Sequence, residues 1–216
     1  CLTENKFIQK GFSMMRRKKL LLLTVPLMAC MALLFAPLCN VFAAPQTDPI
    51  NLSDKTTWPD PQRDTIIIGQ CIGECHHVIT GTFDASTIDH DTTNAVVQVE
   101  GGPHNITFDN AVISLQDGAD KDIHVRAFAL GDTSVVSLSL KGDNVLKSAG
   151  AKAALYVPKQ ASLTIKSEGT SDSTLDASSG FGAAGIGGDS NNGDCGNITI
   201  NASNSTITAS SSARGA

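Results

Sequence analysis

The stretch GAKAALYVPKQASLTIKSEGTSDSTLDASSGFGAAGIGGDSNNGDCGNITINASNSTITAS (residues 150–210) decides the fold. Three short strand patterns follow one another in it and then return in the same order. The first pattern contains Leu155 and returns at Ile186. The second contains Leu163 and returns at Ile198, and the third contains Leu175 and returns at Ile207. Three strands that recur together after about 31 residues are typical of one triangular coil of a parallel β-solenoid.

The same three patterns continue toward the N-terminus. Their earlier members are Ile123 and Val125 for the first, Ile106, Phe108, Leu138 and Leu140 for the second, and Val112 and Val145 for the third. Alternate residues of each strand would point inward, and stacked coils would pair through main-chain hydrogen bonds about 4.8 Å apart. Asn201 and Asn204 are expected to stack in asparagine ladders. A β-sandwich also has many short strands, but it gives no reason for an ordered triple at a near-constant period.

We therefore expect an all-β, right-handed parallel β-helix of about four coils of about 31 residues each, over residues 95–216. The pattern stops in mid-repeat at SSSARGA, which predicts that the chain is cut short. Before the solenoid, residues 65–94 are expected to form an N-terminal cap region. Residues 44–64, with four prolines, are expected to form a leader.

Residues 95–216 also resemble a known family. The order L-T-I, A-A-G-I-G-G, G-N-I-T-I in residues 150–210, with LKGDNVLKSAG (140–150) and HNITFDNAVISL (104–115), is similar to cell-surface β-helix proteins of Gram-positive gut bacteria. The resemblance implies a right-handed parallel β-helix in an adhesin-like or carbohydrate-binding protein, part of a longer, wall-associated chain. It implies no catalytic residues. This sequence departs from the pattern at Cys195 and in the acidic loop at 187–197.

The N-terminal region is typical of a secretory signal peptide, residues 14–43. Four basic residues at 16–19 precede an apolar run at 20–38, and Val41 and Ala43 occupy the −3 and −1 positions of a small-residue cleavage site. Met14 or Met15 is the expected start, which makes residues 1–13 translated upstream sequence. The alternatives are an uncleaved membrane anchor and a lipoprotein acylated at Cys30. We expect cleavage, no membrane span afterwards, and a secreted or cell-surface location.

The charge of the exported part limits its partners. Six of the 16 basic residues and one of the 21 acidic residues lie in residues 1–43, so the exported part carries 10 basic and 20 acidic groups, a net charge of −10. A strongly acidic surface argues against nucleic acid and anionic membrane as partners. It favours a soluble surface protein that could hold cations.

Two acidic turns are the candidate calcium ligands, because calcium prefers several hard oxygen ligands and Asp/Asn-rich turns supply them. Good turn residues would give the same composition without any metal. The candidates are Asp117, Asp120 and Asp122 in QDGADKD and Asp189, Asn191 and Asp194 in GGDSNNGD.

The cysteines of the exported part are Cys71, Cys75 and Cys195, so one is free or pairs elsewhere. Cys71 and Cys75 are the candidate disulfide, provided the chain turns between them, because an extended strand would hold them too far apart. Zinc bound by these two cysteines with His76 and His77 is the alternative. Zinc ligands, however, are usually divided between two separated segments.

No catalytic set is evident. There is no G-x-S-x-G elbow for a nucleophilic serine, and Asp109, Asp117 and Asp143, which could share a solenoid face, are ordinary turn residues. We therefore expect a non-enzymatic stalk or platform for contact with extracellular glycan or matrix. Tyr156 and Trp58 are its available aromatic side chains for sugar stacking. The rival hypotheses are a polysaccharide lyase or glycosidase-like enzyme and a purely structural spacer.

Overall fold

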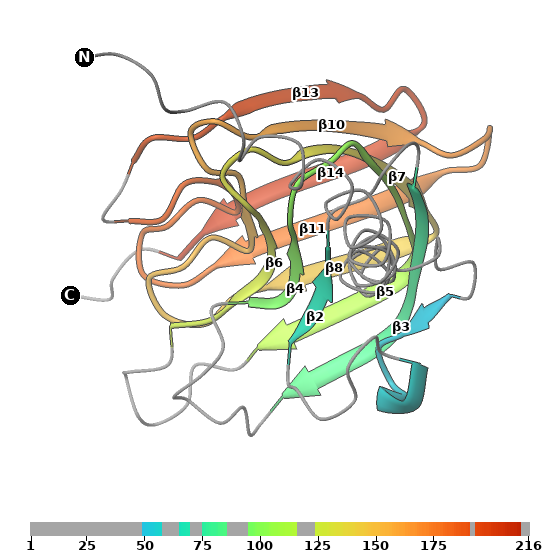
Figure 1. The fold of residues 1–216 in the computed structure, drawn as a ribbon, viewed down its shortest axis with the longest axis horizontal. Helices are drawn as coiled ribbons and strands as arrows, with labels where there is room; N and C mark the ends of the chain where they lie inside the picture. Colours follow the sequence, from blue (N-terminus) through green and yellow to red (C-terminus); the bar gives the residue numbers. More distant parts are fainter. Residues whose placement is uncertain are drawn as a thin grey trace, which may run out of the picture. The chain divides into compact units, whose positions relative to one another are not determined.

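The computed structural model describes residues 49–57, 65–69, 75–85, 95–115, 124–190 and 193–212 (Figure 1). The predicted signal peptide and most of the predicted leader lie outside these residues. The elements are β1 (Ile50–Asn51), the 3-10 turn η2 (Lys55–Thr57), β2 (Ile66–Ile68), β3 (Cys75–Ala85), β4 (Ala95–Val99), β5 (His104–Leu115), β6 (Arg126–Leu130), β7 (Val135–Lys141), β8 (Asp143–Lys147), β9 (Leu155–Tyr156), β10 (Ser162–Ser167), β11 (Ser173–Ser179), β12 (Ile186–Gly187), β13 (Asn197–Asn201) and β14 (Ser205–Ser211).

The strands stack in parallel as a β-solenoid, which confirms the predicted fold class. One sheet has five strands in the order β12-β9-β6-β4-β2, and the chain makes four turns in passing from β2 to β12. The other sheet has nine strands and contains β13-β10-β7-β5-β8-β11-β14, with β3 and β1 attached. No helix in the part of the chain described here is long and apolar enough to cross a membrane. The right hand of the coil stays a prediction.

The nine-stranded sheet forms two faces because β5 is bent. Its first half pairs with β7 and its second half with β8. The bend falls at Asn110, an extra residue in the ladder to β3, where the backbone turns left-handed with φ of 53°. An unpaired residue of this kind is a β-bulge, which sharpens the local twist and bends the strand. The three faces of a coil are therefore the five-stranded sheet, the β7 side and the β8 side.

The core consists of columns of side chains stacked from coil to coil. Ile106, Leu138, Ile165 and Ile200 are successive partners in one column. The first three are completely buried. Phe108 meets Phe128 of the opposite sheet edge to face, with ring centroids 5.3 Å apart. Burial alternates along β7, β8 and β11, as a period-two apolar pattern requires.

Some of the predicted partners are wrong in register. Leu138 pairs with Ile165 and not with Leu163. Leu155 pairs with Phe128, while Ile123 lies outside the described residues. The two-residue shift in the partner of Leu138 leaves the same side of β10 facing the core. Leu163 and Ile165 alternate with less buried residues and therefore point to the same side of the strand.

The third pattern was wrong in phase as well. Val112 and Val145 pair with each other as expected, but both face outward and are only partly buried. Leu175 lies opposite Asn144, which is completely buried. A polar residue therefore occupies a core position for which the sequence predicted valine.

The expected asparagine ladders do not form among the described residues, because neither Asn201 nor Asn204 lies opposite an asparagine of the preceding coil. Asn201 pairs with Lys166 in the β10–β13 ladder, whereas Asn204 N–H donates to the Ser167 hydroxyl at 3.2 Å. The parallel pairing also extends into the predicted cap region, since β2 and β3 pair with β4 and β5.

Candidate functional site

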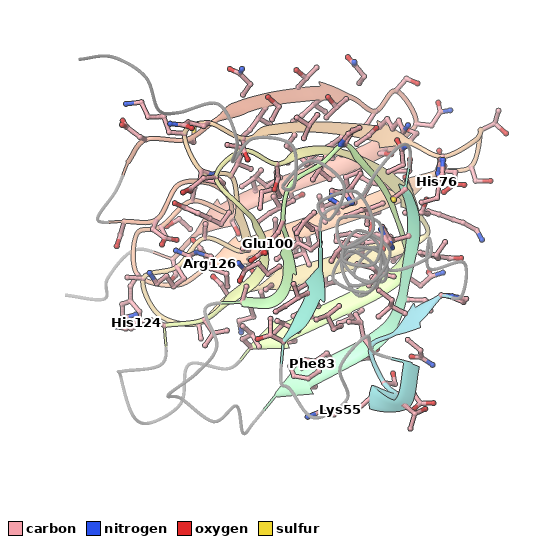
Figure 2. All side chains as sticks on the ribbon, in the orientation of Figure 1. Lys55, His76, Phe83, Glu100, His124 and Arg126 are labelled. Atoms are coloured by element: carbon pink, nitrogen blue, oxygen red, sulfur yellow. The ribbon has the colours of Figure 1, made fainter. Side chains whose placement is uncertain are left out.

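A polar groove of about 410 Å³ lies on the five-stranded sheet, where β4 and β6 end beside β9. We call it the β4–β6–β9 groove. Glu100 and Arg126, labelled in Figure 2, both line it. Its lining residues are Gln98, Glu100, Gly101, Arg126, Ala129, Leu130, Gly131, Asp132, Thr133 and Tyr156.

Strand register creates the hollow. Gln98, Ala129 and Tyr156 are outward-facing partners on three successive coils. Alanine has only a methyl group, so the middle position of this row leaves a gap between two large side chains. The sequence therefore places an amide on one side of the gap and an aromatic ring on the other.

The turn that follows β6 forms one wall of the groove and is held firmly. Gly131 N–H donates to the Val99 carbonyl at 2.7 Å, and the Ser134 hydroxyl donates to the same carbonyl at 2.9 Å. Ser134 is completely buried. These bonds fix the position of Asp132 and Thr133, so the polar groups of this wall are largely preformed.

The aromatic side of the groove carries a stacked cation. The Arg126 guanidinium carbon lies 4.1 Å from the centre of the Tyr156 ring. Arg126 also donates to both carboxylate oxygens of Asp189, at 3.3 and 2.6 Å. Its planar head is thereby fixed against the ring, and its charge is largely compensated.

Asp189 joins three coils. Besides Arg126, it accepts hydrogen bonds from Lys152 Nζ at 3.0 Å and from Ala153 N–H at 2.9 Å. Burial of the carboxyl would raise the pKa of Asp189, but the hydrogen bonds from Arg126, Ala153 N–H and Lys152 lower it below the usual 3.8. The carboxylate is therefore ionised and fully used inside the protein.

The predicted calcium ligands are placed as follows. Asp189 faces two cations, which is the opposite of what a metal ligand requires. Asp194 pairs with Lys159 at 2.8 Å on the surface. Asp117, Asp120, Asp122 and Asn191 lie outside the described residues, and calcium binding by them stays a prediction.

The candidate disulfide and zinc ligands near β3 lie only partly within the described residues. Cys75 is disulfide-bonded, while Cys71, its predicted partner, lies outside the described residues, so this pairing stays a prediction. Cys195 is free and exposed. Within the described ranges no three His, Cys, Asp or Glu side chains form a group that could hold a metal. The zinc alternative is wrong for Cys75, because a disulfide-bonded cysteine has no thiolate to bind zinc.

His77 and His104 form an inward-facing pair from neighbouring coils, with ring centroids 5.8 Å apart. His104 Nε2 lies 3.2 Å from the Glu100 carbonyl, which places the proton on that nitrogen. His104 Nδ1 and both ring nitrogens of His77 are buried without a hydrogen-bond partner among the described residues. The pair is therefore built to stay neutral.

We expect this pair to make the solenoid less stable in mild acid. Burial lowers the pKa of His77 below its usual 6.5, and His104 and His76 lower it further; burial also lowers the pKa of His104. The unfolded chain thus takes up protons first. The pair therefore leaves the free energy of unfolding unchanged above about pH 6.5 and lowers it below that pH. Thermal unfolding followed by circular dichroism between about pH 5 and pH 8 measures this loss.

A His104→Leu variant should lose part of that pH dependence. His76→Gln, an exposed position on β3, is the control and should keep most of it. An unchanged pH profile in His104→Leu would show that other groups cause the acid sensitivity.

The carboxylates that raised the enzyme hypothesis do not lie in the groove. Asp109 pairs with Lys141 at 2.7 Å, and Asp143 accepts a hydrogen bond from the Thr174 hydroxyl. Both are next to the bend between the two faces of the nine-stranded sheet. Asp117 lies outside the described residues. The groove has two other carboxylates, Glu100 and Asp132, which no motif or spacing singled out.

A second hollow, of about 320 Å³, is lined mainly by serines near the ends of β8, β11 and β14. Its inner hydroxyls are already used. Ser148 donates to the Lys152 carbonyl at 2.5 Å, and Ser179 donates to the Ala183 carbonyl. With fewer free polar groups and no aromatic ring, it is a poorer ligand site than the β4–β6–β9 groove.

Comparison with protein-family models, curated proteins and solved structures found no match. The fold and this groove are therefore the features that bear on function. Tyr156 was recognised in the sequence as an available aromatic residue, and Trp58 lies outside the described residues. The row Gln98–Ala129–Tyr156 is not evident from the sequence, because it depends on the strand register between coils.

Proposed function

We propose that this chain is an exported, non-enzymatic surface protein whose β-solenoid binds extracellular glycan in the β4–β6–β9 groove. The observation that carries the proposal is the row Gln98–Ala129–Tyr156, which leaves a gap between an amide and an aromatic ring. A sugar ring has an apolar face that packs on an aromatic ring and hydroxyl groups that need polar partners. Small-molecule sites combine these features in the same way. Because the Arg126 guanidinium stacks on one face of Tyr156, the sugar would pack on the opposite face or the edge of that ring.

The polar groups around the gap suit a neutral or basic sugar. Glu100 and Asp132 supply carboxylate acceptors, and Gln98 is oriented by donating to Glu100 at 2.9 Å. Arg126, the cation among the lining residues, is already compensated by Asp189. An acidic sugar would meet net negative charge here, while hydroxyl or amino groups would meet acceptors.

Avidity can compensate for weak binding at a single groove. One groove of this size would bind a short glycan segment weakly, whereas several copies presented together on a surface gain avidity without any new contact. Export by the predicted signal peptide and the net charge of −10 for the exported part are consistent with this role.

A polysaccharide-degrading enzyme is the second candidate, because Glu100 and Asp132 line the same groove. Glycoside hydrolysis uses two carboxylates on opposite sides of the scissile bond. A structural spacer is the third. A glycan array combined with measurement of reducing-sugar release distinguishes the three: binding without cleavage supports the proposal, cleavage supports the enzyme, and neither supports the spacer.

Tyr156→Ala is expected to weaken glycan binding by about thirtyfold or more, because removal of a central aromatic contact commonly costs about 2 kcal/mol or more. The measurement is titration calorimetry with the best neutral or amino-sugar oligosaccharide from the array. Asp176→Ala, an exposed substitution on β11, is the control and should bind normally. Equal affinity in both variants would remove the groove as the binding site.

A further inference from the structure

The β4–β6–β9 groove holds two carboxylates that no cation among the described residues compensates. Glu100 and Asp132 both line the groove, and both are exposed. The ion pairs between described side chains use other acidic residues, namely Asp109, Asp189 and Asp194. Two negative charges of the groove are therefore available to a ligand, and they bear on which sugar it selects.

The two carboxylates belong to neighbouring coils that approach each other closely. Val99 pairs with Leu130, so Glu100 and Gly131 are the next positions on their two coils. A Cβ on Gly131 would lie only 3.5 Å from the Glu100 Cα atom. Asp132 follows Gly131 directly. The two acidic side chains thus start from neighbouring points of the backbone at one end of the groove.

Hydrogen bonds hold Glu100 in place. Its N–H donates to the Ile68 carbonyl at 2.8 Å, and its carbonyl accepts from His104 Nε2 at 3.2 Å. Its side-chain Oε1 accepts from Gln98 Nε2 at 2.9 Å, while no described residue donates to Oε2. One carboxylate oxygen is therefore oriented by the protein and the other is left for a ligand. Such preorganisation lowers the entropic cost of binding.

The cations beside the groove are used elsewhere. Arg126 is stacked on Tyr156 and donates to both carboxylate oxygens of Asp189. Lys152 donates to Asp189 as well. A cationic group on a ligand would therefore meet two uncompensated carboxylates at the other end of the groove, whereas an anionic group would be repelled by them.

An ammonium group is the cation that a sugar can carry. Amino sugars with a free amine have this group at neutral pH, and N-acetylation removes its charge. An ammonium has only N–H donors and an ionised carboxylate has only acceptors, so the two are complementary, and their hydrogen bonds are charge-assisted. The Tyr156 ring and the Gln98 amide serve charged and uncharged sugars alike. Only the carboxylates distinguish the free amine from its acetylated form.

We propose that the groove is selective for glycans that contain amino sugars with a free amine, and that Glu100 and Asp132 determine this specificity. The proposal rests on the glycan binding proposed above for the same groove. The ammonium group lies at the two carboxylates, and the sugar ring extends across Ala129 to the part of Tyr156 that Arg126 leaves uncovered. Because exposed charge pairs each contribute little, we expect a preference of about tenfold over the acetylated sugar.

The test compares the glucosamine tetramer with the N-acetylglucosamine tetramer by titration calorimetry. The unmodified chain should bind the glucosamine tetramer about tenfold more tightly at low salt, and added salt should reduce this preference because it screens exposed charges. Glu100→Gln and Asp132→Asn should each reduce the preference to about threefold, and the double variant should lose it. Asp176→Asn, which removes an exposed carboxylate on β11, is the control and should keep the full preference.

The outcomes separate this specificity from glycan binding itself. Equal affinity of the unmodified chain for both tetramers, or a preference that survives in the double variant, would overturn the amino-sugar specificity and leave glycan binding in place. Binding of neither tetramer, with another glycan bound on the array, would have the same meaning. A chain that binds no glycan on the array would overturn both proposals.

Discussion

Asn144→Leu should lower the free energy of unfolding by about 3 kcal/mol, even though leucine fits the apolar column in which this residue stands. Asn144 Oδ1 accepts a hydrogen bond from Ala111 N–H at 2.9 Å, in the preceding coil. Its Nδ2 donates to the carbonyls of Lys141, at 3.3 Å, and Thr174, at 3.1 Å, so the side chain reaches the following coil as well. Leucine would leave these buried groups without their partner. Chemical denaturation is the measurement.

The bonds of Asn144 are needed because of the bend beside it. Asn110 is unpaired in its ladder, and Gly142 lies against it with φ of 66°. A Cβ on Gly142 would collide with the Asn110 side chain, so only glycine fits there. The bulge interrupts the backbone pairing, and Asn144 replaces the lost bond to Ala111 N–H.

Lys147→Leu is the control for Asn144→Leu, because it makes a similar change of polarity at an exposed position of the same strand. Its stability should change by no more than about 0.5 kcal/mol. If Asn144→Leu were as stable as the original chain, the hydrogen bonds would contribute little, and packing alone would determine this position.

The repeat predicted the solenoid because each coil has the same local requirements: short strands, alternate apolar residues and small residues at the corners. The phase of the third face could not be read in the same way. Val112 and Val145 are apolar, β-branched and correctly spaced, yet both face outward. In β5 the bulge at Asn110 shifts the alternation by one residue and turns Val112 outward, whereas Val145 lies between the inward residues Asn144 and Leu146. A one-residue shift exchanges the two faces of a strand.

The groove was less predictable than the fold for a related reason. Gln98, Ala129 and Tyr156 are unequally spaced along the chain, and the shorter step from Ala129 to Tyr156 becomes visible only once the strands are paired. Asp189 was recognised as an acidic turn residue, and calcium was the natural interpretation of its neighbours. Its actual partners, Arg126 and Lys152, are 63 and 37 residues away. Sequence spacing gives no sign of such pairs.

Asp189→Ala should be among the most destabilising substitutions in the chain, with a loss of about 3 kcal/mol in the free energy of unfolding. The Arg126 and Lys152 side chains are only 14% and 27% exposed. Removal of their common anion would leave two poorly hydrated cations side by side, and Ala153 N–H would lose its acceptor. Removing one partner from a buried ion pair typically costs about 3–5 kcal/mol, and the partial exposure of Lys152 places the expectation at the lower end. Chemical denaturation at neutral pH measures the loss.

An asparagine variant separates the charge of Asp189 from its hydrogen bonds. Asp189→Asn keeps the size and the acceptor and should lose less stability than Asp189→Ala. Because the pKa of Asp189 is lowered on folding, its contribution is complete above the unfolded value of 3.8 and decreases as the pH falls through the lower folded value. The asparagine variant should therefore be less sensitive to acid in this range.

The double variant Arg126→Met with Asp189→Leu completes the comparison. It removes both charges together and should recover part of the stability lost in Asp189→Ala, as apolar replacements of buried ion pairs often do. Because Arg126 covers the Tyr156 ring, the double variant should also alter glycan binding while remaining folded. A double variant as unstable as Asp189→Ala would show that the Asp189 bond to Ala153 N–H, and not the ion pair, holds the three coils together.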